Sequence, residues 1–261
     1  MSSKMNMANS HSGLQRMLRG YAVLLTVLAA LFSSLAQGQQ YLDVKLLNGA
    51  STWEWHPLII DLGNGNFMVN NVTYNPSGAS VYCHDMTVGF DPFISASVDV
   101  VNNTATPQIY TLIFTLPISP IVGGTRMGGS TQGGVTDAGG GAGGAPDGIG
   151  TVSTIGAGTA LYNGQIDGVD KLALFPDVKT INAPFAGGSA SDSANAGLPA
   201  VSIPGPASAL STIGIKHTFS LTSGDRATFT SFFRVEAAVP EPGSVGLLAI
   251  GGLVLFLRRR R

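Results

Sequence analysis

The chain has 261 residues, of which 35 are glycine and only 11% are charged, and this composition disfavours a helical protein and suits a turn-rich all-β domain. The formal net charge of −1 conceals an asymmetry, because residues 39–236 hold seven basic and fourteen acidic residues. That segment has no basic surface to offer, so nucleic acid is not an expected partner. The single cysteine, Cys83, excludes an intramolecular disulfide, and we expect it to be buried as a small apolar side chain.

The N-terminal segment has the three zones of a secretory signal peptide. Arg16 and Arg19 give a positive start, residues 21–32 form an apolar run, and small residues follow. The apolar run is shorter than the roughly 20 residues that a membrane span needs. We therefore predict that residues 1–38 form a cleavable signal helix, and cleavage after Ala36 is the alternative.

Residues 39–236, called the body from here on, show a hydrophobic period of two. In the clearest segment, 212–221, one face of the strand would carry Ile213, Ile215, His217, Phe219 and Leu221. Similar alternation occurs in 94–101, 108–117 and 227–237, with turn signals such as Asn64-Gly65 between strands. Alternation of this kind is typical of half-buried antiparallel strands. We predict an antiparallel β-sandwich or jelly roll of eight to ten strands in one domain.

Two stretches of the body break this pattern. Residues 128–150 and 182–208 consist mostly of small residues, and we expect both to be long surface loops. The first contains a formal G-x-G-x-x-G at Gly139, Gly141 and Gly144. No helical pattern follows these glycines, so a dinucleotide site is not expected there.

Few residues of the body suggest chemistry, and no cofactor, metal or catalytic residue is expected. His217 lies on an apolar face, which favours a hydrogen-bonded core residue over a catalytic base. Asp167 and Asp170 flank a glycine and have the oxygen ligands that calcium prefers, although Asp167-Gly168 is also a favourable turn. The turn is the favoured interpretation.

Two tryptophans in the stretch STWEWHP are the candidate ligand-binding residues. Trp53 and Trp55 are two residues apart, so in a strand they point to the same side. Paired aromatic rings can stack on sugar rings, which predicts a carbohydrate site if these side chains are exposed. The other interpretation is that both tryptophans pack in the core.

The C-terminal tail combines a proline-rich motif, an apolar run and a basic end. Pro240 and Pro242 disfavour a helix and leave Glu241 in an extended stretch. Residues 244–257 carry no charge and predict a single short hydrophobic helix in the membrane. The tail ends with Arg258, Arg259, Arg260 and Arg261. This arginine block would resist translocation and act as a topological stop, with the body outside and the tip inside the cytoplasm.

This order of features behind a signal peptide resembles the sorting tail of PEP-CTERM proteins. The resemblance covers residues 237–261, with Val239-Pro240-Glu241-Pro242 as the motif. It implies a bacterial protein whose tail an exosortase, an integral-membrane protease or transpeptidase, recognises and processes near the motif. Such systems occur in bacteria that export extracellular polysaccharide, which becomes an expected partner beside the exosortase and the membrane.

The sequence therefore predicts an exported, non-enzymatic protein of the cell envelope or extracellular matrix with a structural or adhesive role. The C-terminal helix would anchor it transiently in the inner membrane. A secreted carbohydrate-binding module is the first alternative. A secreted hydrolase is the second, and it requires a Ser/His or carboxylate cluster that converges in one pocket.

Overall fold

A computed structural model describes residues 42–89, 91–139, 145–176 and 178–238. The predicted signal helix at 1–38 and the predicted membrane helix at 244–257 lie outside these residues. Within the described ranges every regular element is a β-strand, so none of them holds an apolar helix long enough to cross a membrane.

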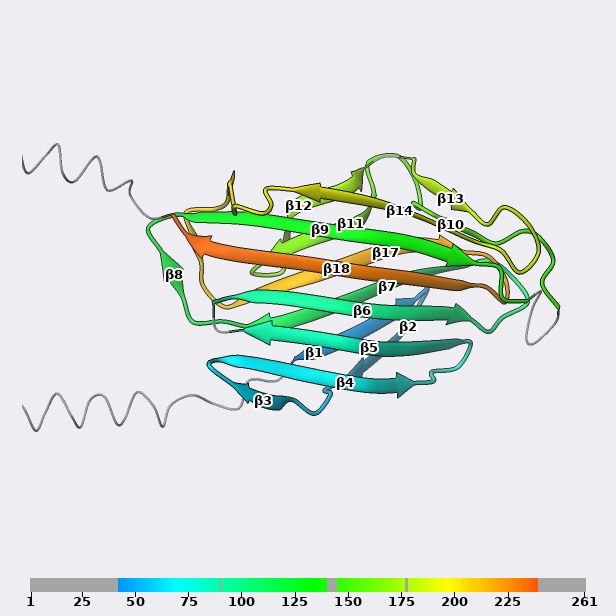
Figure 1. Ribbon diagram of the computed structural model, residues 1–261, viewed down its shortest axis with the longest axis horizontal. Helices are drawn as coiled ribbons and strands as arrows, with labels where there is room; N and C mark the ends of the chain where they lie inside the picture. The colour runs from blue at the N-terminus through cyan, green and yellow to red at the C-terminus, as the bar shows by residue number, and fades with distance from the viewer. Residues whose placement is uncertain (1–41, 90, 140–144, 177, 239–261) are drawn as a thin grey trace, which may run out of the picture. The chain divides into compact units, whose positions relative to one another are not determined.

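Two antiparallel sheets form the body and face each other across one core (Figure 1). Sheet A has, in spatial order, β12 (Val169–Pro176), β11 (Ala160–Ile166), β17 (Thr212–Leu221), β7 (Gln108–Pro117), β1 (Asp43–Asn48) and β2 (Ser51–Trp55). Its remaining strands are β10 (Thr151–Ser153), which pairs with β17, and β13 (Thr180–Asn182), which pairs with β10.

Sheet B lies in front of sheet A in the view of Figure 1. Its spatial order is β14 (Ser189–Ala196), β9 (Thr125–Thr136), β18 (Arg226–Ala237), β6 (Phe93–Asn102), β5 (Ala79–Gly89), β4 (Asn66–Tyr74) and β3 (Ile60–Gly63). A short strand, β15 (Ile203–Pro204), also pairs with β9. β8 (Ile121–Val122) and β16 (Ser208–Ala209) pair with each other and form a separate two-stranded sheet.

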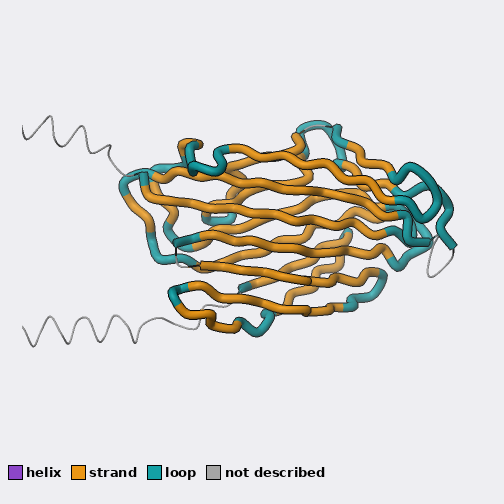
Figure 2. The backbone as a smooth tube through the Cα atoms, viewed as in Figure 1, coloured by secondary structure: helices purple, strands orange, loops and turns teal. Residues whose placement is uncertain are grey.

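The all-β prediction is confirmed, and the strands that the alternation marked most clearly are central ones. In β17 the predicted inward row, from Ile213 to Leu221, is buried, and it faces a similar row on β18. The largest buried side chains are Tyr110, Phe114, Tyr162, Phe219, Phe229 and Phe233. Loops gather mainly at the two ends of the sandwich (Figure 2). The predicted count of eight to ten strands was too low, because the described residues hold 18.

The sequence predicted that the two stretches of small residues are long surface loops, but parts of both stretches form strands. Residues 128–136 lie within β9, which pairs with β18 and β14, and residues 189–196 form β14. The reason is a close approach between the sheets. A Cβ at Gly129 would lie 2.7 Å from the Tyr162 hydroxyl, which donates a hydrogen bond to the carbonyl of Phe232 at 2.8 Å. Gly129 of β9 thus makes room for the Tyr162 ring of the facing sheet.

Two tight hairpins confirm turn predictions. Asn64 and Gly65 connect β3 and β4, and Asp167 and Gly168 connect β11 and β12. All four residues have positive φ, between 51° and 76°. Both central residues of a type I′ turn need this conformation, and Asn-Gly and Asp-Gly adopt it most readily.

Candidate functional site

The two tryptophans point into the sandwich from the edge strand β2. Trp53 pairs with Leu46 and Trp55 with Val44, so both share the inward face of sheet A. Each is half-buried and packs against the core. The Trp55 ring stacks on Tyr74 of sheet B, with centroids 4.6 Å apart. One face of Trp55 is thus covered by another aromatic ring, and this pair closes one edge of the sandwich.

A different aromatic pair lies on the outer face of sheet B. Phe93 of β6 and Phe232 of β18 stack with centroids 5.8 Å apart, and both side chains are partly exposed. Their sequence neighbours Ile94 and Phe233 are buried in the core, which places the pair on the opposite, solvent side of the sheet.

The same outer face carries a shallow groove of about 290 Å³ over β14, β9 and β18. Its polar lining comes from Gln132, Thr136, Ser189, Ser191, Thr228 and Thr230. Gly134 also lines the groove, and no side chain in the lining is charged. Thr136 and Ser189 hydroxyls lie 2.8 Å apart, and the Gln132 amide donates to Ser191 at 3.4 Å. The groove therefore offers neutral donors and acceptors, a set suited to a hydroxyl-rich ligand.

Sequence reasoning did not find this groove. Its serines and threonines come from three strands, two of which lie in the stretches assigned to loops. A usable signal existed in β14, where Ser189, Ser191, Ser193 and Asn195 alternate with three half-buried alanines and with the exposed Asp192. The absence of large apolar residues in that stretch hid its strand character.

His217 is fully buried between the sheets, as predicted for a core residue. Its Nδ1 lies 3.1 Å from the carbonyl oxygen of Leu161, which can only accept, so Nδ1 carries the proton. Its Nε2 then accepts from the Ser231 hydroxyl at 3.0 Å, and Thr131 lies 2.8 Å from the same hydroxyl. Burial lowers the pKa of His217 to about 4, against a smaller opposing effect of the Leu161 hydrogen bond.

The His217–Ser231 pair has the spacing of a base and a nucleophile, but its surroundings are those of a core network. Both side chains are buried, the His217 ring stacks on Phe229 at 4.3 Å, and the group that orients the imidazole is a carbonyl. Ser231 is buried and therefore not accessible to a substrate in this structure. These hydrogen bonds thus give both ring nitrogens of His217 and the Ser231 hydroxyl a partner inside the core.

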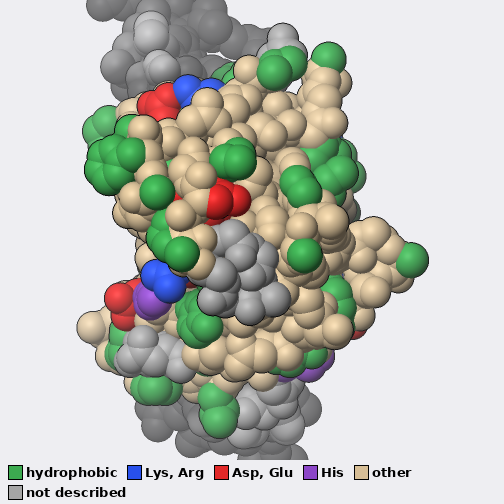
Figure 3. All heavy atoms as spheres, turned by 90° about the vertical axis from the view of Figure 1, so that its right-hand side faces the viewer, with side chains coloured by type: hydrophobic (Ala, Val, Ile, Leu, Met, Phe, Trp, Pro, Cys, Tyr) green, Lys and Arg blue, Asp and Glu red, His purple; other side chains and the backbone are tan. Residues whose placement is uncertain are grey.

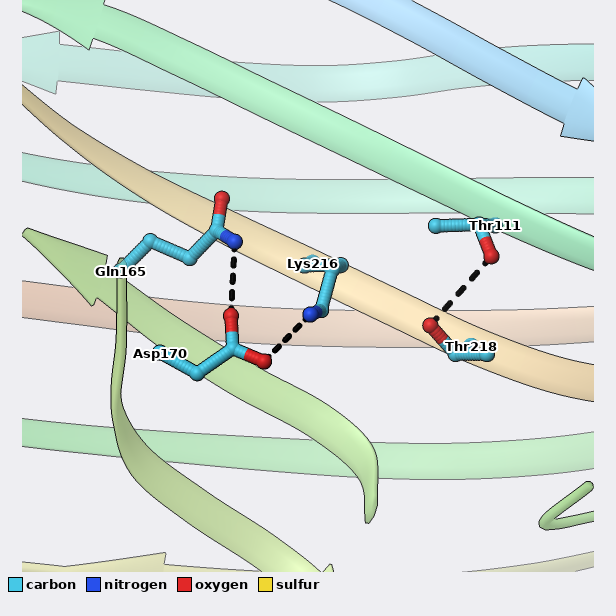
Figure 4. Close-up of polar contacts among 5 residues, drawn as sticks. All are labelled: Thr111, Gln165, Asp170, Lys216 and Thr218. Atoms are coloured by element: carbon cyan, nitrogen blue, oxygen red, sulfur yellow. Dashed lines mark hydrogen bonds and ion pairs between the residues drawn. The ribbon is translucent and has the colours of Figure 1, made fainter. Parts of the chain in front are cut away.

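Asp167 and Asp170 have separate partners. The Asp167 carboxylate accepts from the backbone amides of Leu210, Ser211 and Thr212 at 2.7 to 3.1 Å. Burial acts to raise its pKa, but these hydrogen bonds outweigh burial and hold the pKa at about 2. Asp170 accepts from Gln165 at 2.7 Å and pairs with Lys216, as Figure 4 shows. The favoured interpretation as a turn is confirmed.

Cys83, His84 and Asp85 do not converge. Cys83 faces the core, and burial raises the pKa of its thiol to about 12, as expected for a packed apolar side chain. A bulge in the pairing of β5 with β6 occurs at this point, and His84 and Asp85 are exposed. His84 lies 3.1 Å from Asp99.

The C-terminal end of the body is fixed by hydrogen bonds. β18 ends at Ala237, and the amide of Ala238 donates to the carbonyl of Gly124 at 3.0 Å. The sorting motif predicted at Pro240, Glu241 and Pro242 begins two residues later and lies outside the described residues, as does the arginine block 258–261.

Residues 238–261 match the family model of the PEP-CTERM protein-sorting motif. The chain carries a PEP-CTERM sorting motif. The match covers the predicted proline motif, apolar run and arginine block together. The PEP-CTERM motif implies a protein that is exported to the cell envelope and sorted by an exosortase. No curated protein matches the chain.

Proposed function

We propose that this PEP-CTERM protein is a non-enzymatic structural or adhesive component of the cell envelope or extracellular matrix. The observation that supports the proposal best is the strand from which the tail continues. β18 is a central strand of sheet B and pairs along its length with β9 and with β6. The sorting tail is therefore joined to one of the most extensively paired strands of the body.

This connection suits a protein that bears load. Force applied through the C-terminal end that remains after processing acts along β18, and the hydrogen bonds of antiparallel pairs run perpendicular to the strands. Both ladders are then loaded in shear, so many bonds share the force at once. A tail attached to an edge strand such as β3 would instead load a single ladder.

In this proposal the tail is an address as well as an attachment. An exosortase recognises Pro240, Glu241 and Pro242, while the helix at 244–257 holds the protein transiently in the inner membrane. Arg258, Arg259, Arg260 and Arg261 keep the tip in the cytoplasm. Processing near the motif then passes the body to the envelope or matrix.

Deletion of the gene in the source bacterium tests the structural role. We expect the deletion strain to lose cell-to-cell cohesion or matrix retention, and the full chain to restore it. A full chain with Pro240, Glu241 and Pro242 all changed to alanine is the matched control, because its body is unaltered. It should accumulate in the inner membrane and fail to restore cohesion. Unchanged cohesion after deletion would contradict the structural role.

Carbohydrate binding is the second candidate, and the neutral groove beside Phe93 and Phe232 favours it. A flat face with hydroxyl, amide and aromatic groups matches the chemistry of a neutral polysaccharide. The half-buried Trp53 and Trp55 are the other stacking candidates. Affinity electrophoresis against the bacterium's own extracellular polysaccharide distinguishes the outer face of sheet B from the tryptophans as the binding surface. Loss of retardation in Phe232→Ala supports the outer face, and loss in Trp53→Ala with no change in Phe232→Ala supports the tryptophans.

A further inference from the structure

Two carboxylates are buried together at one end of the sandwich. Asp137 directly follows β9 and Asp225 directly precedes β18. Thr136 and Arg226 are partners in the β9–β18 ladder, so the same register places Asp137 and Asp225 opposite each other one step beyond its end. Each residue is 1% exposed. Like charges in directly opposite positions destabilise a strand pair.

The hydrogen bonds at this pair leave part of its charge uncompensated. Asp225 accepts from the amide of Ala138 at 3.2 Å and from the Thr222 hydroxyl. One oxygen of Asp137, Oδ2, accepts from the amide of Gly148 at 2.6 Å. The other, Oδ1, is buried and has no hydrogen-bond partner among the residues that the structure describes. Burial of a carboxylate oxygen without a hydrogen-bond partner lowers the stability of the folded state, unless a ligand such as a cation occupies the position.

In the described ranges, no cationic side chain forms an ion pair with either carboxylate, Asp137 or Asp225. A third carboxylate, the exposed Asp147, adds negative charge nearby. Burial and the charges of Asp137 and Asp147 raise the pKa of Asp225, although Thr222 and Ala138 oppose this effect. Figure 3 faces this end of the sandwich, where acidic side chains (red) lie near the centre and also at the margin, beside the basic ones (blue).

We propose that Asp137 and Asp225 bind a calcium ion, with the free Oδ1 of Asp137 as a ligand. The oxygen-only chemistry favours a hard cation over zinc or copper, since no histidine or cysteine is part of the pair. Calcium accepts irregular sets of about six to eight oxygens, including backbone carbonyls, hydroxyls and water. Three acidic, histidine or cysteine side chains do not converge in the described part of the chain, so those other oxygens must complete the coordination. The bound ion would join the ends of β9 and β18 next to the loop that contains Asp147.

Direct calcium binding to the full chain in detergent micelles tests this proposal. After treatment with EGTA, titration with calcium chloride near neutral pH should give one saturable site per chain. Calcium at 100 times its Kd should multiply the folding equilibrium constant about 100-fold, which raises the unfolding midpoint. Magnesium chloride at the same concentration should have a much smaller effect.

Asp137→Asn and Asp225→Asn locate the site, and each should weaken calcium binding at least about tenfold through loss of a charged ligand. Asp192→Asn, which changes an exposed carboxylate on β14 that pairs with Lys179, is the matched control and should bind like the wild type. Two results would overturn the proposal. One is a wild-type chain that neither binds calcium nor gains stability from it. The other is calcium binding that both variants retain. The wild-type titration decides the matter even if a variant fails to fold.

Discussion

The ring of Phe233 on β18 covers the backbone of Gly164 on β11, so that a Cβ added at residue 164 would lie 2.4 Å from a ring carbon. Phe233 and Gly164 come from opposite sheets, and their contact joins the two layers within the core. Gly129 and Tyr162 make the reciprocal contact, with the glycine on sheet B and the ring on sheet A. Where one sheet has a glycine, an aromatic ring of the other sheet can therefore pack directly against its backbone.

Gly164→Ala should lower the free energy of unfolding by about 1 to 3 kcal/mol, because the added methyl group overpacks a filled core. Gly133→Ala is a matched control, since a Cβ there would lie 3.4 Å from the nearest ring carbon, an ordinary contact. Urea denaturation of both variants measures the difference. Equal stability of the two variants would contradict the close packing described for Phe233.

Stability should fall as the pH drops from 6.5 toward 4 because of His217. The folded-state pKa of about 4 lies below the ordinary value of 6.5, so the unfolded chain takes up the proton first. This contribution is complete above pH 6.5, is lost progressively down to pH 4 and is constant below that. The full loss amounts to about 3 kcal/mol.

His217→Gln removes this titration and should flatten the pH dependence over that interval. His56→Gln is the control, because His56 is exposed and pairs with Asp43 at 2.7 Å. Unfolding free energies measured at several pH values give the slopes. If His217→Gln keeps the wild-type slope, protonation of the buried imidazole is not its source.

Asp167→Asn should destabilise the chain by about 1.5 to 3 kcal/mol, since it weakens charge-assisted hydrogen bonds to three successive backbone amides. Asparagine tolerates the positive φ of this turn, so the backbone conformation is preserved. Asp170→Asn breaks an exposed ion pair and should cost less than about 1 kcal/mol. Thermal unfolding compares the two, and an equal cost would show that the anchoring of residues 210–212 is worth no more than a surface ion pair.

Trp55→Ala should cost about 2 to 4 kcal/mol, because a half-buried ring stacked on Tyr74 is lost from the edge of the core. Phe232→Ala removes a ring from the outer face and should cost less. Chemical denaturation ranks the two variants. A Trp55→Ala protein as stable as the wild type would show that the ring does not close the sandwich edge.

The sequence predicted those strands and turns whose own residues show hydrophobic alternation or a favourable turn pair. Alternation in β17 and β18 marked strands because large apolar residues recur at every second position, and Asp167-Gly168 marked a hairpin because few other pairs adopt its backbone conformation. β9 was missed because its glycines leave almost no hydrophobic pattern, and its strand character depends on the aromatic rings of β11 and β18 that fill the space. Asp137 and Asp225 were missed as a pair because only the register of β9 and β18 brings them together.

Intact mass spectrometry of the protein recovered from its own cells tests the sorting account most directly. We predict a mature protein that lacks residues 1–38 and ends near Pro240-Glu241-Pro242, since the signal peptide and the membrane helix are both removed. A protein that retains Arg258, Arg259, Arg260 and Arg261 in cells with an active exosortase would contradict this account. The tail would then be a permanent anchor.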